Sequence, residues 1–341
     1  KIFLYDSHEK RWSIESKEQR SKLPKYKTIQ AKKDNLSKPL YKIENYHNEK
    51  NWSRSHGNYF STRFSNLNTI NKNNISKLKL AWVYEPLKSS HSKKENQANI
   101  IYYNGKVFLP NVENNVVALN AENGKKIWEY KVENGIAAKR GLILWKKKES
   151  DKIGRIFFTD NRKYLYSLDT NGVPTKNFGK NGKTKVGLTP LPPVIYKDEL
   201  ILITTDSVIK SYDINSGKIK WKYKINKTKN NLLYSNFSKG SAWGGLSLDV
   251  KRGLLFFTTG NPEPWHVGIF REGDNLYANS LVAFDLNLKK INWHFQEVPH
   301  DVWNYDLAAP PILTMIKRDN KFVDVVVAIS KLGNVIILDR D

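Results

Sequence analysis

One unit recurs along this 341-residue sequence: an apolar strand, a turn with Asn, Asp or Gly, and a second strand that often carries Trp. The copies are VVALNAENGKKIWEY (116–130), LYSLDTNGVPTKNFG (165–179), IKSYDINSGKIKWKY (209–223), LVAFDLNLKKINWHF (281–295) and the half-copy VIILDRD (335–341). Successive copies are 49, 44, 72 and 54 residues apart, measured between Asn120, Asp169, Asp213, Asp285 and Asp339. Repeats of this length in an all-β pattern predict the four-stranded blades of a β-propeller.

The residue types in the repeat have structural explanations. An Asp or Asn at the start of the turn hydrogen-bonds the turn backbone, and Gly adopts the positive φ that hairpin turns require. We interpret the repeated Trp as packing between neighbouring blades rather than as a ligand contact. Further blade strands are expected at residues 106–109, 155–159, 199–205, 253–259 and 323–329, and an insertion at 261–279 accounts for the longest spacing.

The repeats define a division of the chain. Residues 51–341 are predicted to form one β-propeller with about five blades, opened by a helical turn at 73–78 and a strand at 80–84. Residues 1–50 are rich in Lys, Ser, Glu and Asn and are expected to form a basic N-terminal arm. Because about five blades leave a ring open, we expect either a fragment of a longer protein or a second chain that completes the propeller.

The composition excludes several classes of protein. No cysteine is present, which excludes disulfides, Cys-ligated zinc, iron–sulfur clusters and c-type haem attachment. The net charge of +24 is compatible with a polyanion partner. However, the lysines are scattered along the chain and mixed with Asn, and no nucleic-acid motif accompanies them, so we expect no nucleic-acid partner. No run of about 18 apolar residues exists, so no transmembrane helix is expected.

The stretch SLVAFDLNLKKINWHFQEVPHDVWNYDLAAPP (280–311) is the most informative part of the sequence. It reads as two strands joined by a polar turn, at 280–286 and 291–296, followed by a connection rich in Pro, aromatic and acidic residues. Loops of this composition on a rigid sheet often carry function. The stretch therefore predicts a functional site beside this blade.

Four ordered motifs resemble a known family: GGLSLDVKRGLLFFTTGNPEPW, REGDNLYANSLVAFDL, WHFQEVPHDVWNYDLAAPPIL and SKLGNVIILDRD. The chain resembles the pyrroloquinoline quinone (PQQ)-dependent alcohol and glucose dehydrogenases over about residues 51–341. The resemblance implies an eight-bladed quinoprotein propeller with PQQ and Ca²⁺ in its central funnel. It also implies oxidation of an alcohol or aldose, with electrons passed to a cytochrome or to ubiquinone, and a periplasmic or secreted location.

The resemblance assigns candidate site residues. Trp243 falls at the tryptophan that stacks on PQQ, and Arg140 falls at the arginine that binds its carboxylates. Asn261 falls at a calcium ligand, and Lys331 at the basic residue that polarises the quinone carbonyl. Gln97 falls at a position that is Glu or Gln among relatives. Each has an ordinary alternative, as a core, turn or surface residue, and it is their joint occurrence that predicts a cofactor pocket.

The family's general base is the acid after Trp in the PHD-x-W-D stretch, and here that position is Asn304. An amide cannot accept a proton at neutral pH. Asn304 retains a carbonyl oxygen that can contact a cation. Asp301 is assigned mainly to fixing the loop, with proton removal through a water as a strained alternative.

Other positions also depart from the family pattern. A loop that supplies an acidic calcium ligand is shortened, which leaves Asp206 as the acidic substitute. The position at which the family has a Thr near the cofactor is Pro190 in this sequence, and Thr189 lies beside it. Some relatives have two adjacent cysteines near the quinone, and here that place corresponds to about Asn134 and Gly135. Two main hypotheses therefore stand: a PQQ-dependent dehydrogenase, and a non-catalytic propeller of the same descent used for binding or assembly. A polyanion-binding propeller, supported by charge alone, is a third.

Overall fold

The computed structural model divides the chain into two compact units, residues 1–45 and 46–341. The structure describes residues 3–6, 11–14 and 51–341, apart from 66, 87–96, 112, 114, 134, 138, 149–150, 152, 226–239, 270 and 272. In the first unit β1 (Phe3–Asp6) pairs with β2 (Arg11–Ile14). Most of the expected arm and the Asn134 position lie outside the described residues. Among the helices of the described residues, none is long and apolar enough to cross a membrane.

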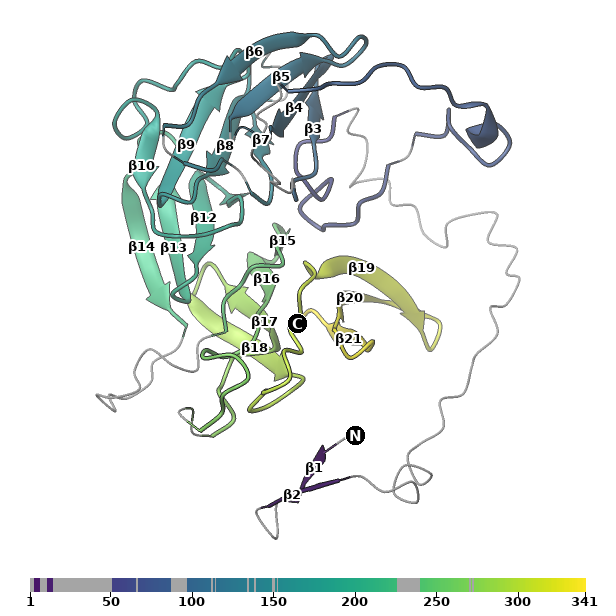
Figure 1. Cartoon of the computed structure of the whole chain (residues 1–341), viewed down its shortest axis with the longest axis vertical. Helices are drawn as coiled ribbons and strands as arrows, with labels where there is room; N and C mark the ends of the chain where they lie inside the picture. Colours follow the sequence, from purple (N-terminus) through teal and green to yellow (C-terminus); the bar gives the residue numbers. More distant parts are fainter. Residues whose placement is uncertain are drawn as a thin grey trace. The chain divides into compact units, whose positions relative to one another are not determined.

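The second unit contains five antiparallel sheets that follow one another along the chain (Figure 1). Four of these sheets have four strands and the fifth has three. Their strands are, in chain order, β3 (Ile101–Tyr103), β4 (Lys106–Pro110), β5 (Val116–Asn120), β6 (Lys126–Tyr130); β7 (Ile143–Trp145), β8 (Arg155–Thr159), β9 (Tyr164–Asp169), β10 (Lys183–Lys185); β11 (Val194–Tyr196), β12 (Glu199–Thr204), β13 (Val208–Asp213), β14 (Ile219–Lys224); β15 (Leu246–Asp249), β16 (Leu254–Thr258), β17 (Ser280–Asp285), β18 (Lys290–Gln296); and β19 (Ile312–Arg318), β20 (Lys321–Ile329), β21 (Val335–Asp339).

Each hydrophobic cluster of the core lies between two consecutive sheets. On β8 the side chains alternate: Ile156 and Phe158 belong to the cluster shared with the first sheet, and Phe157 belongs to the cluster shared with the third. Successive side chains of a strand point to opposite faces, so a sheet covered on both sides needs continuous apolar strands. This packing of sheet against sheet confirms the predicted all-β propeller blades.

The predicted turn chemistry is present in the structure. At the β13–β14 turn, the Asp213 carboxylate accepts hydrogen bonds from the backbone N–H groups of Asn215 (3.1 Å) and Ser216 (2.7 Å). Gly217 completes this turn with a φ of +67°. The register shifts in the first, third and fourth sheets also fall at equivalent places, after Ala118, Ser211 and Ala283. The sequence repeat is thus a repeat of backbone geometry.

The repeated tryptophan packs between blades, as predicted. The Trp128 indole N–H donates to the Thr170 carbonyl of the next sheet at 3.2 Å, and a Cβ added to Gly172 would lie 2.7 Å from the indole. Trp293 likewise donates to the Arg340 carbonyl. The Trp221 ring also stacks on Phe284 of the next sheet, although its indole N–H donates to Glu199 of its own sheet.

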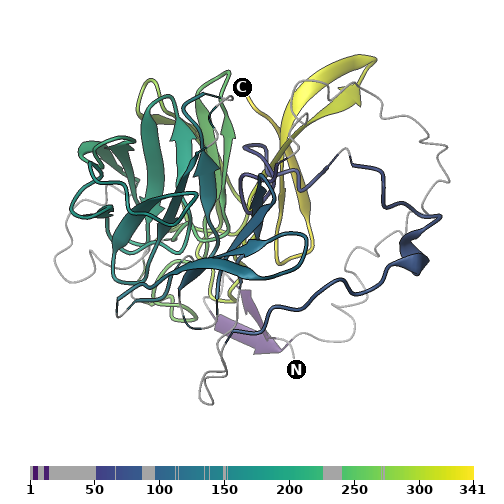
Figure 2. The ribbon, with the colours of Figure 1, turned by 90° about the horizontal axis from the view of Figure 1, so that it is seen from above.

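Two predicted strands are absent. Residues 80–84 are extended but join no strand of the described chain, and Trp82 instead docks on the β5–β6 turn through the Ala121 carbonyl. The second strand that the repeat predicts at residues 174–179 is replaced by turns and isolated bridges. The fourth strand of this sheet is instead β10, a few residues later. The helical turn predicted at 73–78 is a 3₁₀ turn, Ile75–Lys77. Figure 2 shows the β19–β20 hairpin extending beyond the neighbouring sheets.

The sheets have two different ends. Consecutive sheets are joined by connections that enter the first strand of each sheet, namely β7, β11, β15 and β19. Because neighbouring strands are antiparallel, the β12–β13, β16–β17 and β20–β21 connections lie at that same end, which we call the connection end. The Asp-initiated turns of the repeat lie at the other end, which we call the turn end.

Residues 52–61 form a segment that contacts the first strands of four sheets. Trp52 pairs with Tyr102 on β3, and the Ser53 carbonyl accepts from the Leu144 N–H on β7. The Tyr59 and Phe60 carbonyls accept from Leu248 on β15 and Leu313 on β19. We call residues 52–61 the axial segment, because they bridge the innermost strands.

Candidate cofactor-binding site

The predicted site residues come from different connections at the connection end. Arg140 lies between β6 and β7, and Trp243 lies between β14 and β15. The Arg140 guanidinium carbon is 4.8 Å from the centre of the Trp243 ring, the geometry of a cation–π contact. Burial lowers the pKa of Arg140 below its usual value. The Trp243 ring and the positively charged Arg140 side chain, which is suited to binding an anion, therefore lie next to each other.

A second group of side chains joins three further connections. The Asn261 side-chain N–H donates to the Asn304 amide oxygen. The Lys331 ammonium is 2.7 Å from the Asp306 carboxylate and 3.1 Å from the Asn304 carbonyl. Asp306 also accepts from the Asn261 backbone N–H at 2.6 Å. Asn304 has a φ of +70°, in the left-handed region that Asn tolerates better than most residues.

Gly260 is the point where the two groups meet. A Cβ added to Gly260 would lie 2.7 Å from the Trp243 indole nitrogen and 2.8 Å from an Asp306 carboxylate oxygen. A residue with a side chain does not fit there without displacing one of them. The predicted residues Arg140, Trp243, Asn261 and Lys331 are therefore neighbours in space, although they are far apart in sequence.

Asp301 holds the loop that carries Asn304. One carboxylate oxygen accepts from the Trp303 N–H at 2.7 Å. The other accepts from the Tyr305 N–H at 2.7 Å and the Asn279 side chain at 2.6 Å. Asp301 is 2% exposed, and its oxygens are occupied by loop contacts. This geometry agrees with the assignment of Asp301 to loop structure.

The other predicted residues lie outside these groups. Thr189 is buried, and its hydroxyl accepts from the Leu191 N–H at 3.3 Å. Asp206 is exposed in the β12–β13 turn, and Gln97 is exposed before β3. Among the described residues, no hydrogen bond or ion pair connects these three to the Asn261–Lys331 group. Their assignment as cofactor or metal contacts remains a prediction.

His56 and Asp306 are parts of the site region that the sequence did not single out. Burial, with Arg63, Arg54 and Arg140 nearby, lowers the pKa of His56 to about 3, so its ring is neutral at pH 7. A Cβ on Gly245, two residues after Trp243, would lie 3.1 Å from the His56 ring. The sequence signal is the polar run SRSHG at residues 53–57, before the first repeat.

The residues present are of the types that bind a hard cation and an aromatic carboxylate. The Asn261 amide oxygen is buried and has no hydrogen-bond partner among the described residues, which leaves it available as an oxygen ligand. Among those residues no group of three or more His, Cys, Asp or Glu side chains forms a metal cluster, so amide oxygens would have to supplement Asp306. Arg140 and Trp243 supply the cation and the ring that a flat polycarboxylate requires.

Comparison with known proteins establishes the family. Residues 52–341 match the family described as "PQQ: Glucose/ethanol/alcohol dehydrogenase, beta-propeller domain". The chain belongs to this family of quinoprotein propellers.

Curated relatives and solved structures agree with this assignment. The chain is 27% identical to quinoprotein glucose dehydrogenase from Escherichia coli over 86% of the chain and 42% of the relative. It is 26% identical to quinohemoprotein alcohol dehydrogenase from Comamonas testosteroni over 85% of the chain and 45% of the relative. The crystal structure of that Comamonas enzyme matches with a TM-score of 0.66 and 24% identity, over 85% of this chain and 47% of that one. A europium-containing methanol dehydrogenase matches with a TM-score of 0.66 and 21% identity, over 85% of this chain and 56% of that one. These structures support the propeller fold, and the chain spans less than half the length of the two curated relatives.

Proposed function

We propose that this chain binds PQQ together with Ca²⁺ at the connection end of its blades. The observation that carries the proposal is the convergence of Arg140, Trp243 and the Asn261–Lys331 group around Gly260. In this proposal Trp243 supplies the stacking surface and Arg140 binds a carboxylate of the cofactor. Asn261 and Asn304 supply oxygen ligands to the cation, with Gln97, Thr189 and Asp206 as peripheral contacts.

We propose further that the bound cofactor turns over slowly or not at all. Asn304 stands at the base position, and loss of a general base typically costs about 10²–10⁴ in rate. Asp301 does not replace it, because its oxygens accept hydrogen bonds from Trp303, Tyr305 and Asn279. The chain would then be a PQQ-binding propeller for binding or assembly rather than an efficient enzyme.

The second candidate is a working alcohol or aldose dehydrogenase. One observation favours it: Lys331 is held by Asp306 and Asn304, and Asp306 is a carboxylate within the group. PQQ, when bound, supplies a two-electron acceptor. Lys331 would then place its positive charge beside that acceptor, and a carboxylate of the group would take the substrate proton through a water. Electron transfer to a cytochrome or ubiquinone, and a periplasmic or secreted location, belong to this candidate.

One experiment separates the two candidates. The purified full chain is incubated with PQQ and Ca²⁺, desalted, examined for quinone absorbance, and assayed for dye reduction with ethanol and with glucose. Retained absorbance without turnover supports the binding propeller. Retained absorbance with turnover supports the dehydrogenase. Loss of all PQQ on desalting contradicts both.

A further inference from the structure

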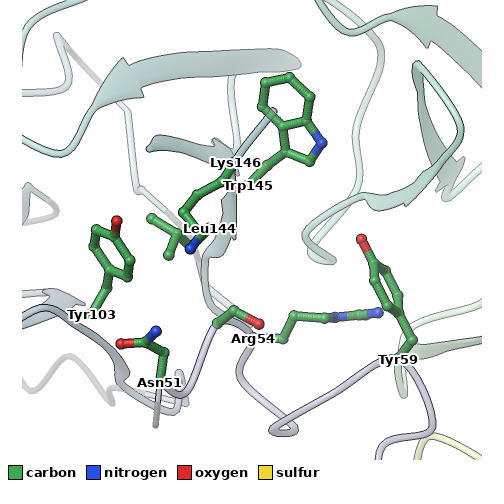
Figure 3. Close-up of a pocket in the computed structure, with 8 residues that line it drawn as sticks. Asn51, Arg54, Tyr59, Tyr103, Leu144, Trp145 and Lys146 are labelled. Atoms are coloured by element: carbon green, nitrogen blue, oxygen red, sulfur yellow. The ribbon is translucent and has the colours of Figure 1, made fainter. Parts of the chain in front are cut away.

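Three arginines of the described chain are almost completely buried, although burying a charge is costly unless it is paired or well hydrogen-bonded. They are Arg54, Arg271 and Arg340, which are 4%, 2% and 3% exposed. Arg340 pairs with the buried Asp249 carboxylate at 2.9 Å. Arg54 lines a cavity of about 220 Å³ and directs its guanidinium toward the Tyr59 ring (Figure 3). Arg271 differs from both, because its contacts lie on loops of the candidate cofactor site.

The Arg271 side chain joins the insertion at 261–279 to the loop that follows β18. Its Nε donates to the Val267 carbonyl at 3.2 Å, and its Nη1 donates to the Asn275 amide oxygen. Its Nη2 donates to the Asp301 backbone carbonyl at 2.8 Å. Burial lowers the pKa of Arg271, but an arginine remains charged at neutral pH. One buried cation therefore holds two segments together through three neutral oxygen atoms.

These two segments supply the two amide side chains proposed as cation ligands. Asn261 begins the insertion, and Asn304 lies in the loop three residues after Asp301. The Asp301 carboxylate accepts from the backbone N–H groups on either side of Asn304, while Arg271 holds the Asp301 backbone carbonyl. The position of the Asn304 loop relative to the insertion therefore depends on Arg271.

Arg271 links the middle of the insertion to the loop, and other contacts link its end and its surface. At the end of the insertion, the Asn279 side chain donates to the Asp301 carboxylate at 2.6 Å. His266 and His300 make contacts at the surface, where water can replace them. A change of Arg271 is therefore expected to alter how the two segments lie relative to each other, while Asn279 still holds Asp301.

We propose that Arg271 is a positioning residue that sets the separation of the Asn261 and Asn304 amide oxygens and so raises the affinity of the site for a hard cation. Outer contacts that orient metal ligands typically contribute about 10–100-fold to metal affinity. Arg271 is not itself a ligand, because a guanidinium has no acceptor atom. The inference rests on the proposed cation site and assigns a role to a residue outside it.

The sign of the effect separates position from charge. The positive charge of Arg271 repels a cation, so removal of that charge alone would strengthen cation binding. Removal of the three hydrogen bonds would instead weaken binding, because the ligand oxygens would lose their fixed separation. A lower affinity after loss of Arg271 therefore reports its positioning role.

The test titrates Tb³⁺, a hard cation that takes oxygen ligands as Ca²⁺ does, into the full chain without PQQ. Terbium luminescence excited through tryptophan reports the binding, because Trp243 lies beside Gly260, the neighbour of Asn261. We expect saturable binding that Ca²⁺ reverses, and an affinity about tenfold lower in Arg271→Met.

Two variants serve as controls. Arg340→Met is matched for burial, and the contacts of Arg340 lie on β15, β19 and β20 rather than on the loops of the site. It should lose stability in urea unfolding and bind Tb³⁺ as the wild type does. Arg318→Met removes the same charge from a side chain that is 77% exposed, and it should change neither property.

A measurement on the wild type needs no variant to fold. The NMR resonance of the Arg271 Nε–H should shift when Ca²⁺ is added, because Arg271 binds the loop that carries Asn304, and the resonance of the Arg340 Nε–H should not. The inference is overturned by equal or tighter Tb³⁺ binding in a folded Arg271→Met, by an equal loss of affinity in Arg340→Met, or by an unshifted Arg271 resonance. Absence of Tb³⁺ binding to the wild type would contradict the proposed cation site itself, and this inference with it.

Discussion

The turn end and the connection end of the blades differ in whether their residues and contacts repeat from one blade to the next. At the turn end, each repeat uses the same devices: an Asp or Asn that caps the turn, and an aromatic ring that packs on the next blade. At the connection end, each loop differs, and the side chains that meet there come from five connections. Repetition therefore marks what holds the sheets together, and irregularity marks where a ligand would bind.

Among the substitutions that compare the two ends, we expect the largest effect from a change of Asn304 at the connection end. In the PQQ-loaded protein, Asn304→Asp should raise turnover by about 10²–10⁴, because it places a carboxylate at the proposed base position. Dye reduction with ethanol and glucose measures this. Asn320→Asp, in the exposed β19–β20 turn, is the control and should change nothing. A folded, PQQ-loaded Asn304→Asp without added turnover would argue that more than the base is missing.

A substitution of Trp128 tests how much the packing at the turn end contributes to the stability of the fold. Trp128→Ala should lower the free energy of unfolding by about 3 kcal/mol, because the indole fills the space over Gly172 and its N–H bonds Thr170. Urea unfolding measures the loss. Trp265→Ala, in the insertion at the connection end, should cost no more than about 0.5 kcal/mol, since Trp265 is 59% exposed. Equal losses in the two variants would remove the distinction between the ends.

Asp301 is a structural exception at the connection end. Asp301→Ala should cost about 2 kcal/mol, because it leaves the Trp303 and Tyr305 N–H groups and the Asn279 amide without their acceptor. The exposed Asp319→Ala is its control and should be neutral. If Asp301 served mainly as a base, the variant would keep its stability and lose turnover instead.

The effect expected at His56 is confined to acidic pH, where it appears as a dependence of stability on pH. Its pKa falls from 6.5 to about 3 in the folded chain, so between these values the unfolded chain binds a proton that the folded chain excludes. Stability should therefore fall as the pH drops, by up to about 1.4 kcal/mol per pH unit from this group. His56→Gln should have a shallower acid slope in urea unfolding than the wild type. An unchanged slope would show that His56 is solvated.

The sequence predicts the turn end well and the connection end unevenly. The blade strands and the Asp213-type turns follow from apolar runs and turn residues, which act locally. The strand expected at 80–84 fails because pairing needs a neighbour that local pattern does not reveal. The resemblance brings Trp243, Arg140, Asn261 and Lys331 together, but their contacts with Asp306 and Gly260 depend on loops far apart in sequence. The burial of Arg54 was missed because it comes from contacts with β7 and β15, which are far from it in sequence.

The most direct test of the account is the affinity for PQQ in the presence of Ca²⁺, followed by quenching of tryptophan fluorescence. We expect saturable binding to the wild-type chain, weakened about tenfold or more in Arg140→Met and unchanged in Arg318→Met. Absence of binding to the wild type, or equal binding by Arg140→Met, would contradict a cofactor site at the connection end.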